Sequence, residues 1–357
     1  MITESSPSSN YLEVIKTLLL LLAAFAKQYE QRRPDIAKTS IEGIKILRGF
    51  SRRIEADPFV AGFIGLSNVG KSTLLNALFG MGIAPRKNRP MTSSPVEYSY
   101  ADEFRVLVEY ADTFERADEI CADAESLLDC IEKYATEEGP HATSEIKKVS
   151  ASVPSDILQG GLVIADTPGF GAAQVGMDEG LHESILLNFL PNIHQLFWVV
   201  LFEQGITSRE AEFYAKHLKG NCADIIVTGS EETTINDQRR FVKLFERKLD
   251  LHLVTFHFLS GKEAWNGKKK GDANQIEKSG IRRFESRLKQ MSSPVARLLC
   301  LNADIVKFAQ DLGVWLRTAL STKEIDWPQT VVQRVFFAAK TIPGDSSFVE
   351  RLAVALK

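Results

Sequence analysis

The chain has 357 residues, which predicts about two domains, and an apolar fraction of 44% with 25% charged residues is ordinary for a soluble globular protein. A formal net charge of −3 disfavours broad nucleic-acid binding, which requires a strongly basic face. The four cysteines show neither C-x-x-C nor His-paired metal spacing, so a reduced, cytoplasmic chain is expected.

The N-terminal part of the chain is predicted to be helical after a short tail. Residues 1–10 are rich in Ser and Pro and are expected to be disordered. Residues 11–57 carry apolar side chains at helical spacing, with a break near Pro34. The apolar run at 18–26 has the length of a signal-peptide core, but two acidic residues precede it, so export is disfavoured, and the run is too short to span a bilayer.

The stretch FVAGFIGLSNVGKSTLLNAL at 59–78 predicts a nucleoside-triphosphate site. GLSNVGKS matches the pattern G-x-x-x-x-G-K-[ST] at every fixed position. Gly65 and Gly70 permit backbone dihedrals that turn amide N–H groups toward a phosphate chain, and the helix that follows points its positive end at the anion. Lys71 would reach the β- and γ-phosphates, and the Ser72 hydroxyl can ligate Mg²⁺.

Residues 58–290 alternate apolar runs with helical patterns, which predicts an α/β domain whose mainly parallel sheet is covered on both faces. Strands are expected at 59–64, 103–110, 145–153, 162–165, 195–202, 224–227 and 253–259, and helices at 72–80, 208–219, 234–249 and 280–290. The acidic segment 113–134 is interpreted as a solvated outer helix, and the lysines at 268–270 as a basic loop.

Residues 291–357 are again helical in pattern. An amphipathic helix placed before the first strand cannot bury its apolar face alone. We therefore expect the helices at 11–57 and 291–357 to form one helical bundle.

Two further motifs fit the same chemistry. The sequence DTPG, which begins at Asp166, directly follows an apolar run. Asp166 can hold Mg²⁺ through a water, and Gly169 lets its backbone N–H approach a γ-phosphate. Thr92 is the residue expected to ligate Mg²⁺ from a loop that closes only on the triphosphate, and its neighbours Ser93 and Ser94 remain alternatives.

The sequence predicts recognition of the base less clearly than it predicts binding of the phosphates. Guanine selectivity usually rests on [NT]-K-x-D, and the corresponding residues 228–231 read TGSE. Thr228 fits, Glu231 keeps a carboxylate one methylene further out, and Gly229 lacks the stem that would pack on the base. The SGK sequence at 260–262 fits a loop that contacts the base. The alternative that Glu231 is only a helix N-terminal acid stays open.

With these residues placed, the chain resembles the bacterial dynamin-like GTPases. The segments that carry the resemblance are GLSNVGKSTLLNAL, NRPMTSSP, ADTPGF and VLFEQGITSREAEF, in the order and spacing of that superfamily. The resemblance implies a P-loop GTPase domain at 58–290 flanked by a bundle, with pairing of two GTPase domains that stimulates hydrolysis. In that family the bundle passes the change to a stalk that remodels membranes, whereas the tail at 291–357 is shorter than a full stalk.

The resemblance also implies roles for individual residues. The residues expected to bind nucleotide are Gly65, Ser67, Asn68, Val69, Gly70, Lys71, Ser72, Thr73, Thr228, Glu231, Ser260, Gly261 and Lys262. Those expected to act in catalysis are Asn68, Lys71, Thr92 and Gly169, and those expected to hold Mg²⁺ are Ser72, Thr92 and Asp166. Asn68 matches a residue that helps to coordinate K⁺ in potassium-activated members. Phe170 stands where small signalling GTPases have the Gln that orients water, so charge stabilisation must come from a partner chain or a monovalent cation.

The leading hypothesis is a Mg²⁺-dependent, dynamin-like GTPase that forms a homodimer through its GTPase domain, works with a companion dynamin-like subunit, and is cytoplasmic or peripheral on a membrane lipid surface. A ribosome-assembly or RNA-associated GTPase shares the phosphate-loop sequence almost letter for letter, but the acidic net charge disfavours nucleic acid as a partner. A non-catalytic scaffold with a degenerate base site is the third hypothesis.

Overall fold

The computed structural model describes residues 7–85, 95–110, 116–135, 146–169, 179–218, 223–249, 254–293, 297–298 and 308. The chain divides into two compact units. One comprises 1–56, 219–222 and 294–357, and the other comprises 57–218 and 223–293.

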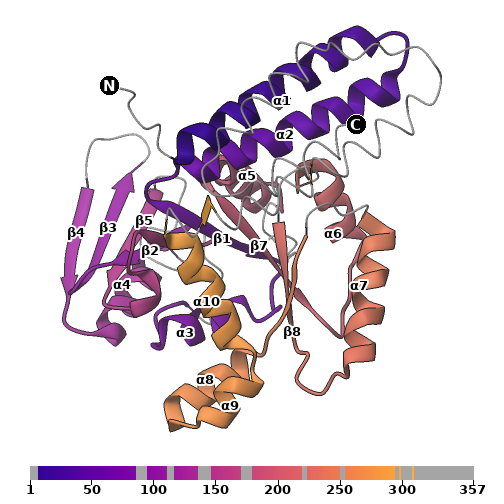
Figure 1. Ribbon diagram of the computed structural model, residues 1–357. Coiled ribbons are helices and arrows are strands. Elements are labelled where there is room, and N and C mark those ends of the chain that lie inside the picture. Colours follow the sequence, from indigo (N-terminus) through magenta and orange to yellow (C-terminus); the bar gives the residue numbers. More distant parts are fainter. Residues whose placement is uncertain are drawn as a thin grey trace. The chain divides into compact units, whose positions relative to one another are not determined.

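The first unit contains a pair of long helices, α1 (Pro7–Tyr29) and α2 (Pro34–Glu55), which pack side by side (Figure 1). The predicted break at Pro34 is confirmed, because Pro opens α2 where its missing N–H costs nothing. The disorder expected over residues 1–10 is wrong for 7–10, where Pro7 opens α1 in the same way. No helix in the described ranges is long and apolar enough to cross a membrane.

Two described residues of the C-terminal segment contact α2. The Arg297 guanidinium donates to the carbonyl oxygens of Arg53 at 3.0 Å and Ala56 at 2.7 Å, which are carbonyls left over at the end of the helix. The ring of Phe308 meets that of Phe50 edge-on, with centroids 6.2 Å apart. The rest of the predicted helices at 299–357 lies outside the described residues.

The second unit is built on a nine-stranded sheet in the order β4-β3-β5-β2-β6-β1-β7-β8-β9, among the residues that are described (Figure 1). The strands are β1 (Phe59–Gly65), β2 (Val96–Tyr100), β3 (Phe104–Tyr110), β4 (Arg116–Cys121), β5 (Ile146–Val153), β6 (Leu162–Asp166), β7 (Gln195–Leu201), β8 (Ala223–Thr228) and β9 (Phe256–Phe258). The pairs β6–β1, β1–β7, β7–β8, β8–β9 and β2–β5 are parallel. The predicted α/β class with a mainly parallel sheet is confirmed.

The helices of this unit are α3 (Lys71–Phe79), α4 (Ala124–Ala135), α5 (Glu179–Phe189), α6 (Ser208–Phe213), α7 (Ile235–Leu249), α8 (Gly261–Lys270), α9 (Ala273–Lys278) and α10 (Ile281–Ser292). Short 3₁₀ turns lie at Asp156–Leu158 (η1) and Leu190–Asn192 (η2), and a π-helical turn at Tyr214–Leu218 (η3) continues α6.

Two sequence predictions are wrong, and one strand was missed. The segment 113–134 is not one helix, because Arg116–Cys121 forms β4, whose alternating side chains suit a strand that pairs with β3. Residues 96–100 form β2, a strand that was not predicted, between β5 and β6. The lysines at 268–270 are not a loop but the last turn of α8, where cations complement the helix dipole.

Each face of the sheet has its own aromatic core. On one face Trp198 of β7 stacks on Tyr214 with centroids 5.8 Å apart and meets Phe245 of α7 at 6.2 Å. On the other face Phe284 of α10 lies edge-on to Phe63 of β1, with centroids 6.2 Å apart. β1 is therefore buried on both faces, and its seven residues are all buried.

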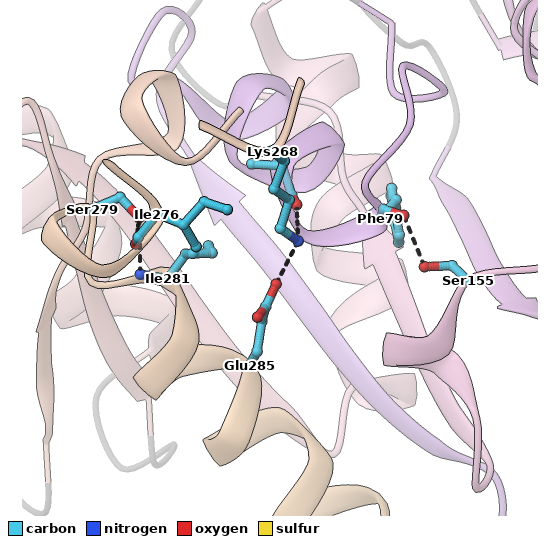
Figure 2. Close-up of polar contacts among 8 residues, drawn as sticks. Phe79, Ser155, Lys268, Ile276, Ser279, Ile281 and Glu285 are labelled. Atoms are coloured by element: carbon cyan, nitrogen blue, oxygen red, sulfur yellow. Dashed lines mark hydrogen bonds and ion pairs between the residues drawn. The ribbon is translucent and has the colours of Figure 1, made fainter. Parts of the chain in front are cut away.

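Figure 2 shows how the C-terminal end of α3 is fixed. The Lys268 ammonium of α8 donates to the Ala77 carbonyl and to the Glu285 carboxylate of α10, both at 2.6 Å. The Ser155 hydroxyl donates to the Phe79 carbonyl at 3.1 Å. These donors satisfy carbonyls that have no partner inside the helix, and they tie α3 to α8 and α10.

The contact between β4 and α4 gives a pH-dependent contribution to stability. The Lys133 ammonium, 2.8 Å away, and the Tyr134 hydroxyl donate to the Glu119 carboxylate and lower its pKa from 4.5 to about 2. Because the folded-state pKa lies below the unfolded value, the ionised carboxylate stabilises the fold above about pH 4.5, and this stabilisation is lost as the pH falls toward about 2.

We therefore expect Glu119→Gln to be less stable than the parent at pH 7 and equally stable at the acid end of that window. Urea unfolding at a series of pH values measures the difference. A stability difference that does not change with pH would contradict the role given to this carboxylate.

Candidate functional site

The candidate site is the loop between β1 and α3, at the carboxyl end of an inner strand of the sheet. Asn68 has a φ of 73° and is the only described non-glycine residue with positive φ, in a conformation that Asn adopts more readily than most residues. Gly70 has a φ of 86°. A Cβ on Gly65 would lie 2.5 Å from the Val199 carbonyl oxygen, so only glycine fits where the loop leaves the sheet.

The first turn of α3 follows the loop directly and has no side-chain cap. Its N-cap residue, Gly70, has no side chain to accept from the first amides. Ser72 and Thr73 lie half-buried in this turn. A helix start with uncapped N–H groups and a positive dipole end favours an anion.

Lys71 and Asp166 meet beside this loop. The Lys71 ammonium lies 2.7 Å from an Asp166 carboxylate oxygen and also donates to the Thr167 carbonyl. Their side chains are 11% and 3% exposed. The pairing follows from sheet order: β6 lies beside β1 with Asp166 opposite Phe63, and the Thr167 hydroxyl donates to the Phe63 carbonyl at 2.9 Å. Two motifs almost a hundred residues apart in the sequence thus form one buried charged pair.

Tyr98 of β2 is buried and close enough to Asp166 to be affected by its charge. Burial, together with the negative charge of Asp166, raises the pKa of Tyr98 well above its ordinary value. Tyr98 therefore stays protonated, and its hydroxyl lies 3.3 Å from the Ile83 carbonyl, to which it donates. Gly169 is buried, three residues after Asp166.

Thr228 connects the end of β8 to the loop between β1 and α3. Its hydroxyl lies 2.5 Å from the Val69 carbonyl oxygen and 3.1 Å from that of Val200. The sequence assigned Thr228 to the nucleotide, whereas in this structure its hydroxyl bonds the protein backbone and braces the loop.

Glu231 and Ser260, from the two predicted base-contact segments, are brought together. The Ser260 hydroxyl donates to the Glu231 carboxylate and accepts from the Glu263 amide at 3.1 Å, where it caps α8. Gly261 packs against α3, since a Cβ there would lie 2.9 Å from the Leu74 nitrogen. Lys262 is exposed beside them.

Gly229 occupies the place of the missing lysine. Its φ is 68°, and an added Cβ would lie 2.8 Å from a methyl carbon of Leu201. A side chain is therefore disfavoured at this position both by conformation and by space.

Four residues named from the sequence are not among those that the structure describes. Thr92, with its neighbours Ser93 and Ser94, and Phe170 lie outside the described residues. Sequence reasoning missed Tyr98, because it lies on the unpredicted strand β2, and it missed the contribution of Val199, which acts through its backbone carbonyl.

Comparison with known proteins gives a consistent result. The sequence-family model described as Dynamin family matches residues 62–229. An uncharacterized protein in the xynA 3′ region of Caldicellulosiruptor sp. (strain Rt8B.4) is 25% identical over 279 residues, which are 76% of this chain and 65% of that protein. A bacterial dynamin-like protein of Nostoc punctiforme (strain ATCC 29133 / PCC 73102) is 25% identical over 173 residues, 48% of this chain and 24% of that one.

A solved structure shares the fold. It is an oligomerised bacterial dynamin pair, described as providing a mechanism for the long range sensing and tethering of membranes, with a TM-score of 0.51 and 16% identity over 94% of this chain and 52% of that chain. The chain spans less than two thirds of the length of each of these three relatives.

Proposed function

Because residues 62–229 of this chain match the sequence-family model described as Dynamin family, we propose that the protein is a dynamin-like GTPase that binds GTP with Mg²⁺ and hydrolyses it. The observation that carries the proposal is the buried ion pair of Lys71 and Asp166 beside an uncapped helix start. A buried cation that can exchange its carboxylate partner for phosphate oxygens suits a triphosphate.

The phosphates are held by the amides of the loop and by Lys71. The hydroxyl of Ser72 and the carboxylate of Asp166, with Thr92 from its loop, are hard oxygen donors of the kind Mg²⁺ prefers. When bound, Mg²⁺ neutralises charge that develops on the phosphate oxygens. The Gly169 amide is directed at the γ-phosphate in this scheme, and Thr228 keeps the loop in place through Val69.

Hydrolysis draws on a second copy of the GTPase domain and on K⁺ held with the help of Asn68. Asn68 is exposed on the loop, where such an ion could be reached. Phe170 cannot orient a water by hydrogen bonding, so in this scheme the second copy and K⁺ supply the charge stabilisation. It predicts a specific activity that rises with protein concentration and is higher in potassium than in sodium.

Nucleotide-dependent pairing would then act on the helical unit, with a companion dynamin-like subunit and a peripheral membrane surface as partners. The support is the membrane tethering described for the oligomerised bacterial dynamin pair.

Titration of the purified chain with fluorescent GTP, GDP and ATP in Mg²⁺ tests the proposal first. We expect saturable binding with a preference for guanine nucleotides, and phosphate release from GTP. Binding of none of the three at millimolar concentration would overturn the proposal, and binding without hydrolysis in potassium would reduce it to a nucleotide-binding scaffold.

Base selectivity is assigned to Glu231. Its carboxylate accepts a hydrogen bond from the Ser260 hydroxyl, and in this proposal it also accepts from the N–H groups of guanine. Glu231→Ala is expected to reduce the preference for GTP over ATP about tenfold or more, because a hydrogen bond to a charged group contributes about 1.5–3 kcal/mol. Competition binding measures the ratio, and Glu232→Ala, an exposed neighbour, is the control.

Restoring the missing lysine gives a second test of the same site. Gly229→Lys is expected to weaken GTP binding, since the left-handed φ of 68° and the contact with Leu201 both oppose a side chain. A gain in GTP affinity would show that the backbone at 229 adapts freely.

A further inference from the structure

The two ends of the nine-stranded sheet carry helices of opposite charge. α4 packs on β3, β4 and β5, at the end of the sheet that terminates in β4. α7 lies at the other end, where Phe245 packs against Phe256 of the outermost strand β9 with ring centroids 5.9 Å apart. The two helices are well separated in Figure 1 and belong to the same compact unit.

α4 presents an acidic stripe. Glu125, Asp129 and Glu132 follow one another at i, i+4 and i+7, which places them on one side of a helix. The opposite side, with Leu127 and Ile131, is buried against the sheet. Glu125 and Asp129 are exposed, and Glu132 is half-buried.

α7 presents a basic stripe with the reverse spacing. Arg240, Lys243 and Arg247 lie at i, i+3 and i+7, and all three are exposed. The opposite side, with Phe241 and Phe245, is buried. Both helices therefore turn a row of three like charges away from the sheet.

Most of these charged side chains have no ion-pair or hydrogen-bond partner within the described part of the chain. In the part of the protein that is described, the side chains of Glu125, Asp129, Lys243 and Arg247 take part in no ion pair or side-chain hydrogen bond. Like charges side by side on one helix repel one another, and a complementary row of charges reduces this repulsion.

We propose that α4 of one copy of this chain docks antiparallel on α7 of a second copy. With the helices antiparallel, the spacings match: Arg240 faces Glu132, Lys243 faces Asp129 and Arg247 faces Glu125. A second copy is the partner because one chain carries both complementary rows.

The contact is head-to-tail, since each copy uses its acidic end against the basic end of the next. Such an interface leaves one row free at each end, so it builds an open chain of copies unless the rotation closes a ring. It requires no nucleotide, which separates it from the GTP-dependent pairing of GTPase domains.

Exposed ion pairs are individually weak and are screened by salt, so the association depends strongly on ionic strength. Three pairs predict an association constant that falls about tenfold between about 50 and 300 mM salt. The affinity itself is therefore expected to be modest at low salt.

Sedimentation velocity of the full chain without nucleotide tests the proposal. At low salt, from about 5 to 100 µM protein, the parent is expected to self-associate. A variant with Arg240→Glu, Lys243→Glu and Arg247→Glu should stay monomeric, as should a variant with Glu125→Lys, Asp129→Lys and Glu132→Lys. A mixture of the two variants should associate again, because each then offers the row that the other lacks.

The matched control changes three lysines that belong to neither row to Glu, namely Lys269, Lys270 and Lys278. It changes the net charge by the same amount as the reversal of the basic row does. It should associate as the parent does. The proposal is overturned by a parent that is monomeric at low salt, by reversal variants that associate like the parent, or by a mixture that stays monomeric although circular dichroism shows both variants folded.

Discussion

Changing Lys71 to Ala is expected to weaken GTP binding by at least about a hundredfold and to abolish hydrolysis, because this residue supplies the cation of the proposed phosphate site. The ammonium lies 2.7 Å from an Asp166 carboxylate oxygen, and the Lys71 side chain is only 11% exposed. Binding is measured by titration with labelled GTP, and turnover by phosphate release.

Lys71→Ala is also expected to change the free energy of unfolding, and this effect can be measured separately from the loss of GTP binding. Without Lys71 the Asp166 carboxylate is buried and unpaired, which costs roughly 3 kcal/mol in the free energy of unfolding. Adding Asp166→Asn should recover much of this stability in urea unfolding but no GTP binding. Lys269→Ala, which removes an exposed lysine of α8, is the control for charge. GTP binding that survives Lys71→Ala would remove the basis of the proposed function.

Gly65→Ala is the second change for which we expect a large effect. The new Cβ would lie 2.5 Å from the carbonyl oxygen of Val199, a distance that real Cβ atoms essentially never show. The obstacle is backbone of a central strand, so the phosphate loop must move instead. We expect a loss of about 1–3 kcal/mol of stability, as in other overpacked cores, and GTP binding weakened at least about tenfold.

Gly82→Ala is the matched control, because the nearest atom to its added Cβ is a ring carbon of Trp265 at 3.6 Å, an ordinary contact. It should bind GTP and unfold like the parent. Parent-like GTP affinity in Gly65→Ala would mean that the loop can shift without losing its geometry.

The sequence predicted the parts of this protein that depend on near neighbours in the chain. The glycine positions of the phosphate loop, the Asp166 motif after a buried strand and the break at Pro34 all follow from local backbone rules. It failed at β4, where an acidic segment read as helix pairs with β3 instead. Strand pairing depends on a partner elsewhere in the chain, and local periodicity over five or six residues is a weak guide to it.

By itself the sequence determined that a glycine-containing loop with the G-x-x-x-x-G-K-[ST] pattern lies between a buried strand and a helix, because glycine dihedrals and helix propensities act within a few residues. Only the tertiary structure decided what that loop touches. Sheet order sets Asp166 beside Lys71, and the ends of β8 and α8 bring Thr228 to Val69 and Ser260 to Glu231. These contacts join residues 29 to 159 positions apart, and their geometry comes from packing on a shared sheet.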